Sequence, residues 1–161
     1  MFKYLAEKPL LFLITVALLF SGCYTSLGVI SHTYNYNSNI TFTIEKVEEG
    51  KSISTGNGYY YTNAGFKYVF VYISFKNNSD EKQKLDFGNF YLLEPKSHTK
   101  YKVEFAMFEG VINTFGRVAS QIQKNDTKNR KLVFTFPEND RAEMLSVNDE
   151  IYNIQYAVAK N

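Results

Sequence analysis

The sequence is poor in the residues that build disulfide scaffolds and metal centres. Its 161 residues include one cysteine, two histidines and no tryptophan. A single cysteine cannot form a disulfide bond within the chain, and two histidines with one cysteine are too few for a His/Cys zinc site. The formal net charge of +2 provides no basic surface of the kind that binds nucleic acid. We therefore expect no metal, cofactor or nucleic acid as a ligand.

The N-terminus has the organisation of an export signal. An apolar run over residues 9–20 follows a short basic start and precedes the small residues Ser21 and Gly22. As a helix, this run would be about 18 Å long, well short of the roughly 30 Å hydrocarbon core of a bilayer. A cleaved secretory signal is therefore favoured over a membrane-spanning helix. We expect residues 1–22 to be a signal peptide that is removed on export.

The only cysteine, Cys23, stands directly after this signal. The stretch "LLFSGC" resembles the lipobox of bacterial lipoproteins, with Phe20 where Leu is usual. In that class the cysteine thiol is alkylated with diacylglycerol and becomes the first residue of the mature protein. Acyl chains contribute roughly 0.8 kcal/mol per buried CH₂, so two chains form a stable anchor. The resemblance implies a lipid on Cys23 and an extracytoplasmic, membrane-anchored location in the cell envelope; an uncleaved signal anchor is the alternative.

The exported part divides into a short linker and one domain. Residues 23–39 are rich in Ser, Thr, Asn and Tyr without a clear period, which is typical of a flexible tether. From residue 40 to residue 161, short apolar segments alternate with polar residues in the period of two that half-buried strands show. The longest of them, in residues 66–79, has one β-branched face and one aromatic face. About seven such strands separated by turns predict an all-β, antiparallel sandwich.

A family resemblance supports this fold class. Residues 65–101, "GFKYVFVYISFKNNSDEKQKLDFGNFYLLEPKSHTKY", resemble the telokin-like, immunoglobulin-like domain of bacterial lipoproteins and exported proteins. The shared pattern is a long hydrophobic strand ending in Asn, a polar turn, an aromatic-Leu strand and a Lys-Tyr step. The stretch "KLVFTFP" is similar to a later strand of the family, whereas "KNDTKN" replaces its Gly-rich step. The resemblance covers residues 40–159 and implies an immunoglobulin-like sandwich outside the cytoplasm, without transferring any catalytic residue.

No residue pattern in the sequence predicts catalysis. Ser97 and His98 are adjacent, so on a strand their side chains point to opposite faces, and no Gly-x-Ser-x-Gly elbow is present. The glycines of "GNGYYY" lack the third glycine and the helix of a nucleotide-binding loop. Asp80, Glu81 and Asp86 are interleaved with lysines, which disfavours a calcium site. We therefore expect a protein that is not an enzyme; a small hydrolase acting on wall or glycan is the weaker alternative.

Two segments have the composition of contact surfaces. Tyr59, Tyr60 and Tyr61 lie beside Gly and Asn, and rigid tyrosines provide contact area at low entropic cost. Residues 105–115, "FAMFEGVINTF", are apolar enough that they must either cap the sandwich or form a hydrophobic patch. The sequence therefore predicts a lipid-anchored domain that binds an envelope protein or polymer through a tyrosine-bearing loop. The alternatives are tyrosines packed on the sandwich edge and a domain that is a passive spacer.

Overall fold

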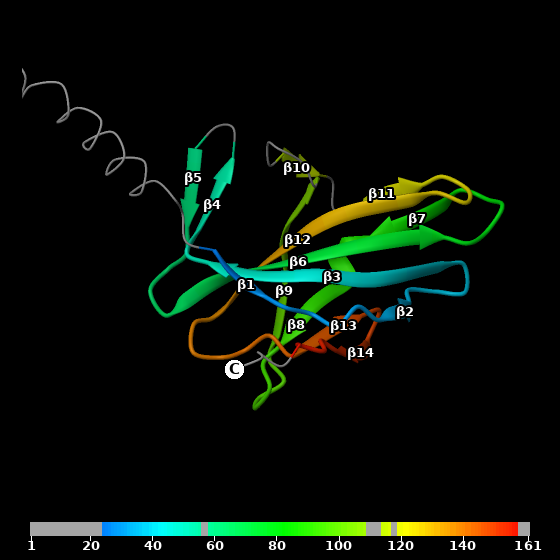
Figure 1. The fold of residues 1–161 in the computed structure, drawn as a ribbon. Helices are drawn as coiled ribbons and strands as arrows, with labels where there is room; N and C mark the ends of the chain where they lie inside the picture. The colour runs from blue at the N-terminus through cyan, green and yellow to red at the C-terminus, as the bar shows by residue number, and fades with distance from the viewer. Residues whose placement is uncertain (1–23, 56–57, 109–113, 117–118, 158–161) are drawn as a thin grey trace, which may run out of the picture.

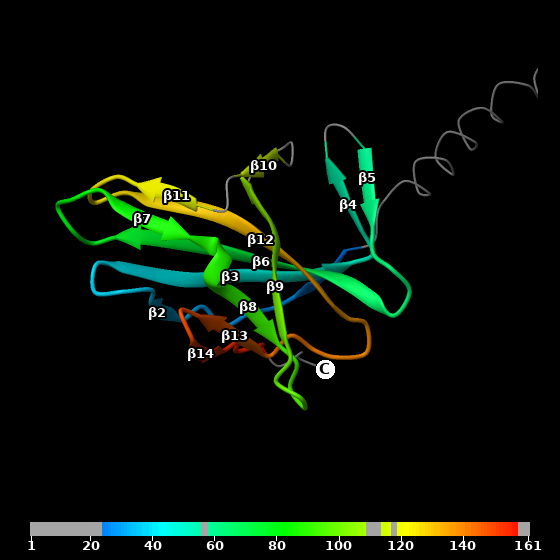
Figure 2. The ribbon, with the colours of Figure 1, turned by 180° about the vertical axis from the view of Figure 1, so that it is seen from behind.

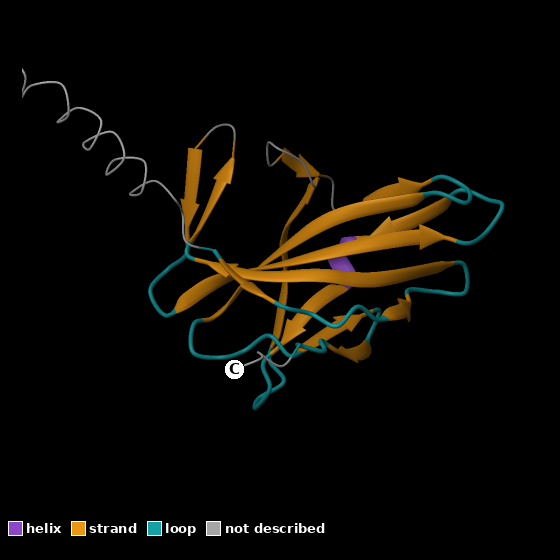
Figure 3. Cartoon of the chain, viewed as in Figure 1, coloured by secondary structure: helices purple, strands orange, loops and turns teal. Residues whose placement is uncertain are grey.

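The structure, a computed structural model, describes residues 24–55, 58–108, 114–116 and 119–157. The predicted signal peptide and Cys23 lie outside these residues. Strands dominate the described chain, with one short 3₁₀ turn, η1 (Phe87–Asn89), drawn in purple in Figure 3. None of the described residues belongs to a helix with the length and hydropathy needed to cross a bilayer.

The described residues form fourteen strands. The two strand pairs that stand apart from the large sheet are β4 (Ser52–Thr55) with β5 (Gly58–Tyr61), and β7 (Gln83–Asp86) with β11 (Ala119–Ile122). The strands of the large sheet are β1 (Thr25–Leu27), β2 (Thr33–Asn35), β3 (Ile40–Gly50), β6 (Phe66–Asn77), β8 (Phe90–Leu93), β9 (Lys100–Phe108), β10 (Thr114–Gly116), β12 (Thr127–Pro137), β13 (Met144–Val147) and β14 (Glu150–Asn153). Their order is β1-β3-β6-β12-β9-β8-β13-β14, with β2 paired to β3 and β10 paired to β9.

The large sheet becomes a sandwich because it folds over at β9. The second half of β9 pairs with β12, while its first half pairs with β8. The register between β9 and β12 shifts at Val133 and Phe134, and such irregularities bend and twist a sheet locally. Figures 1 and 2 show β8, β13 and β14 as a second layer beside β3, β6 and β12. The predicted antiparallel β-sandwich is confirmed. It has more than seven strands because three- and four-residue strands are too short to show a period.

The core between the layers follows the alternation that the sequence predicts. One face of β6 points into the main core and the other face points to the outer side of the sheet. Phe70 and Tyr72 belong to a second, smaller cluster on that outer side. The side chains of β6 that face the main core are Val69, Val71, Ile73 and Phe75. The β-branched face is therefore the fully buried one, as a strand between two layers requires.

The segment that the sequence assigns to a flexible tether is part of the sandwich. Instead of extending away from the domain, β1 pairs with residues 47–49 of β3, and β2 pairs with residues 41–43. This corrects the predicted tether of residues 23–39 for its described part, residues 24–39. The polar composition of residues 24–39 did not indicate strands, because the tyrosines supply apolar contact area and the backbone supplies the hydrogen bonds.

The same segment also reaches the second layer. Val29 forms an antiparallel bridge with Tyr156, which follows β14. The Ile30 N–H donates to the carbonyl of Gln155 at 2.7 Å, and the Ala157 N–H donates to the carbonyl of Gly28 at 2.8 Å. The N-terminal segment therefore joins the edge of one layer to the edge of the other and closes the sandwich opposite β9.

Tyrosine side chains reinforce this closure. The Tyr34 hydroxyl donates to the carbonyl of Asn153 at 2.8 Å, and the Tyr152 hydroxyl donates to the carbonyl of Asn35 at 2.7 Å. Their ring centroids are 4.9 Å apart. Each tyrosine thus hydrogen-bonds to the strand of the other. The carbonyl groups of Asn35 and Asn153 are therefore not available to pair with the edge strand of a second chain.

One of these tyrosines predicts how stability depends on pH. Burial raises the pKa of Tyr152 to about 12, with further contributions from its hydrogen bond to Glu150 and the charge of that carboxylate. An unfolded tyrosine has a pKa of about 10, so the folded state holds the proton more tightly. Its contribution to stability is complete below pH 10 and is lost as the pH rises towards 12. We expect the free energy of unfolding in urea to fall over this range, and Tyr152→Phe to fall less. An identical pH dependence of the two proteins would contradict this assignment.

Candidate functional site

The predicted tyrosine loop is one strand of a hairpin. Tyr59, Tyr60 and Tyr61 belong to β5, which pairs antiparallel with β4; residues 56–57 of its turn lie outside the described residues. Because side chains alternate along a strand, Tyr59 and Tyr61 share the outer face and Tyr60 takes the inner face. Across the hairpin, the pairs are Ser52 with Tyr61, Ile53 with Tyr60, and Ser54 with Tyr59.

The inner face of the hairpin packs on the outer side of the large sheet. Ile53 is fully buried there, and the Tyr60 ring lies 6.1 Å from the ring of Phe105. These contacts hold the hairpin in one position. The other buried members of this small cluster are Tyr68, Phe70, Met107 and Val133. This packing was not predicted from the sequence, although Ile53 in "KSISTG" shows the alternation of a half-buried strand.

The outer face of the hairpin presents two tyrosine rings to solvent. Tyr59 and Tyr61 are 61% and 71% exposed. Their ring centroids are 6.4 Å apart and the ring planes differ by only 27°, so the two rings form one aromatic surface beside Ser52 and Ser54. Of the three tyrosines, Tyr60 is the one whose ring packs against the large sheet. We define Tyr59 and Tyr61 as the tyrosine face.

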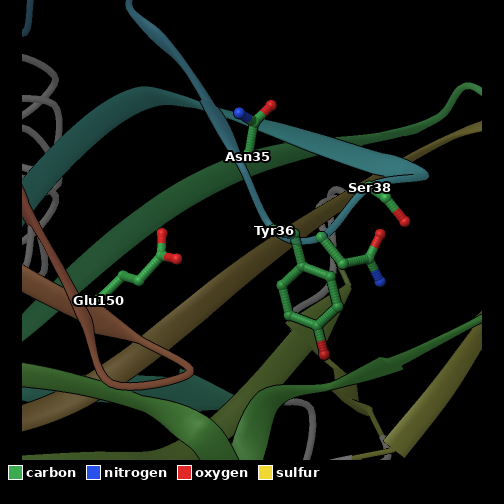
Figure 4. A pocket seen from close by; sticks show the side chains of 5 residues that line it. Asn35, Tyr36, Ser38 and Glu150 are labelled. Carbon is green, nitrogen blue, oxygen red and sulfur yellow. The ribbon is translucent and has the colours of Figure 1, made fainter.

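A polar hollow of about 370 Å³ lies between the N-terminal segment and β14, and Figure 4 shows its lining side chains. Two of its polar side chains, those of Asn37 and Glu150, make hydrogen bonds within the fold. The Asn37 side chain accepts the N–H groups of Asn39 and Ile40, each at 2.8 Å. The Glu150 carboxylate, 2.5 Å from the Tyr152 hydroxyl, shares the single hydroxyl hydrogen with the Asn35 carbonyl. The arrangement stabilises a turn and the sandwich closure, and it pairs no nucleophile with a base.

The residues tested for catalysis and metal binding have structural contacts. Ser97 and His98 lie in the turn between β8 and β9, where the Ser97 hydroxyl donates to the Glu94 carboxylate. Asp86 accepts the N–H of Gly88 at 3.0 Å and caps η1. Within the described ranges, no group of three His, Cys, Asp or Glu side chains is placed to hold a metal ion.

The apolar segment at residues 105–115 divides between the two expected roles. Ala106 and Met107 are buried, while Phe108 is 45% exposed beneath the guanidinium of Arg130, which lies 4.3 Å from the ring centroid. Residues 109–113 lie outside the described residues. The described part consists of the end of β9 and the first two residues of β10, which pairs with β9, so it belongs to the sheet.

Fold and site together define a β-sandwich protein with an exposed aromatic hairpin. A conserved hypothetical protein from Bacillus anthracis is similar in structure, with a TM-score of 0.59, 14% identity, and 83% of this chain and 97% of that chain covered. An uncharacterized beta-sandwich protein from Clostridium difficile 630 is similar with a TM-score of 0.51, 15% identity, and 83% and 87% covered. The chain belongs to the family described as "Domain of unknown function (DUF4352)", whose model matches residues 35–158. No curated protein matches the sequence.

Proposed function

We propose that this protein is an exported lipoprotein of the cell envelope and that its sandwich is a non-catalytic interaction domain. The lipobox-like sequence before Cys23 supports the lipid anchor, and the resemblance to telokin-like domains of exported proteins supports an extracytoplasmic setting. The interaction role is carried by one observation: the tyrosine face is exposed on a hairpin that buried Ile53 holds in place.

A fixed aromatic surface favours binding for two physical reasons. Tyr59 and Tyr61 offer large amphipathic side chains whose hydroxyls stay solvated while the rings make contact. The hairpin is ordered before it meets a partner, so little conformational entropy is lost on association. The partner of the tyrosine face is a component of the cell envelope.

The anchor and the tyrosine face are tested with two variants of the full chain expressed in a bacterial cell. The membrane-extracted protein is expected to lack residues 1–22 and to carry a diacylglyceryl adduct by intact mass. Cys23→Ser is expected to release the protein from the membrane fraction, whereas the control Ser26→Ala stays bound. An unmodified full-length mass would contradict the anchor.

The second variant, Tyr59→Ser with Tyr61→Ser, removes only exposed side chains. We expect its free energy of unfolding to stay within about 0.5 kcal/mol of the parent, as for most surface substitutions. Its photo-crosslinks to envelope components are expected to disappear. An unchanged crosslink pattern in this stable, anchored variant would show that the tyrosine face is not the contact surface.

A further inference from the structure

Tyr24, the first described residue, is fixed on the sheet beside the hairpin. Its hydroxyl donates to the carbonyl oxygen of Ser52 in β4 at 3.1 Å. Its ring meets Phe70 edge to face, with centroids 5.2 Å apart. Gly50 makes this position possible, because a Cβ atom there would lie 2.7 Å from the Tyr24 ring. The chain therefore leaves the fold towards Cys23 from a defined point.

This point lies next to the tyrosine face. Cys23 is bonded directly to Tyr24, and consecutive Cα atoms are about 3.8 Å apart. Tyr24 in turn contacts Ser52, whose cross-strand partner is Tyr61. Directly opposed residues on antiparallel strands are about 5 Å apart. A lipid on Cys23 would therefore enter the bilayer close to Tyr61, because only Tyr24 and Ser52 lie between the two residues in this series of contacts.

Exposed aromatic side chains gather at this end of the molecule. Figures 1 and 2 both place the β4–β5 hairpin at one extremity, on the opposite side from β14. Tyrosine is enriched at membrane–water interfaces, because its ring enters the boundary of the acyl region while its hydroxyl remains hydrated. Among the described residues, the large apolar or aromatic side chains that are well exposed are Tyr24, Tyr59, Tyr60 and Tyr61 on or beside the hairpin, together with Ile30, Phe108 and Ile151.

We infer that the tyrosine face contacts the headgroup region of the membrane that holds the anchor, and so fixes the orientation of the sandwich on the bilayer. This inference rests on the proposed lipid anchor and identifies the partner of the tyrosine face as the lipid surface itself. The inference requires that no flexible tether separates the anchor from the domain. This condition is met because β1 and Tyr24, which directly follow Cys23, are packed on the sheet. The anchor keeps the hairpin at a high effective concentration at the surface, so individually weak tyrosine contacts suffice.

The contact is aromatic rather than electrostatic. Polybasic segments bind anionic lipids through unpaired lysines and release them at high salt. Here three lysines in or directly after the strands beside the hairpin are paired with carboxylates of the same chain. These ion pairs are Lys46 with Glu48 at 2.5 Å, Lys51 with Glu138 at 2.6 Å, and Lys67 with Glu49 at 2.8 Å. We therefore expect the contact to persist at high salt.

The lack of native tryptophan allows a direct test. Tyr61→Trp and Tyr59→Trp place a single fluorophore on the tyrosine face, and Ile151→Trp places one at an equally exposed site, 57% accessible, on β14. The full-length variants are purified from membranes and reconstituted in vesicles of phosphatidylethanolamine and phosphatidylglycerol. We expect the first two to emit at shorter wavelength and to be quenched by lipids brominated near the headgroup end of the acyl chain. Ile151→Trp should emit as in water and remain unquenched.

Each other outcome overturns the inference. Water-like emission from Tyr61→Trp and Tyr59→Trp in an anchored protein would show that the tyrosine face points away from the lipid. Equal quenching at Ile151→Trp would show that the domain has no fixed orientation. A shift that requires added envelope proteins would assign the tyrosine face to a protein partner. A protein that does not sediment with the vesicles would refute the proposed anchor as well. Intact mass of the same sample shows whether the lipid is present, and so separates failure of the anchor from failure of the inference alone.

Discussion

Phe75→Ala is expected to lower the free energy of unfolding by about 3–5 kcal/mol, the usual cost of deleting a fully buried phenylalanine ring. Phe75 has no exposed surface and lies at the centre of an aromatic cluster. Its ring centroid is 6.2 Å from that of Phe42, 5.6 Å from Phe87 and 5.8 Å from Phe90. Since a domain of this size is stabilised by about 5–15 kcal/mol in total, urea unfolding should show a large shift of the midpoint.

Phe108→Ala is the matched control for this substitution. The same ring is removed from a side chain that is 45% exposed, so less apolar surface returns to water and no closed cavity forms. We expect less than half of the loss seen for Phe75→Ala. Equal losses in the two variants would mean that the aromatic cluster is not the stabilising core.

Tyr36→Ala is expected to lower the free energy of unfolding by about 3 kcal/mol, close to the cost of a core aromatic deletion. The Tyr36 ring stacks on Phe90 with centroids 6.0 Å apart, and its edge-to-face partner is Phe75. Its hydroxyl accepts the N–H of Asp86 at 3.1 Å. A tyrosine in a flexible tether would have none of these contacts, so urea unfolding of this variant separates the two descriptions of residues 24–39.

Two further variants localise the effect of Tyr36. Tyr36→Phe keeps the stacked ring and removes only the hydroxyl, which should cost about 1 kcal/mol, as for a typical hydrogen bond. Ser31→Ala changes an exposed residue of the same segment and should leave the unfolding curve unchanged. If Tyr36→Ala were as neutral as Ser31→Ala, the N-terminal segment would not be part of the folded unit.

The closure of the sandwich could not be predicted from the sequence because its contacts join distant residues. Tyr34 hydrogen-bonds to Asn153 across 119 positions, and Tyr152 hydrogen-bonds to Asn35 across 117. A period of two reports which face of a strand is buried, but it carries no information about which strand lies beside it. Short strands such as β1 and β2 also lack enough residues to show any period.

The sequence indicated which tyrosines could form a contact surface, but it did not predict which of them face solvent. The identity of Tyr59, Tyr60 and Tyr61 indicated a contact surface, since tyrosine combines area with low entropic cost. The division into an outer pair and an inner Tyr60 depends on pairing with β4 and on the burial of Ile53. Both are settled by packing against β6, β9 and β12, which the local sequence does not encode.

The sequence by itself determined the fold class and the faces of the long strands, because alternating apolar residues can be buried on one side only when the chain is extended. Tertiary structure alone decided where the domain begins, how the two layers close, and that Tyr24 lies against the hairpin. These features depend on hydrogen bonds and ring contacts between segments far apart in the chain, whose partners are chosen by the geometry of the assembled sheet.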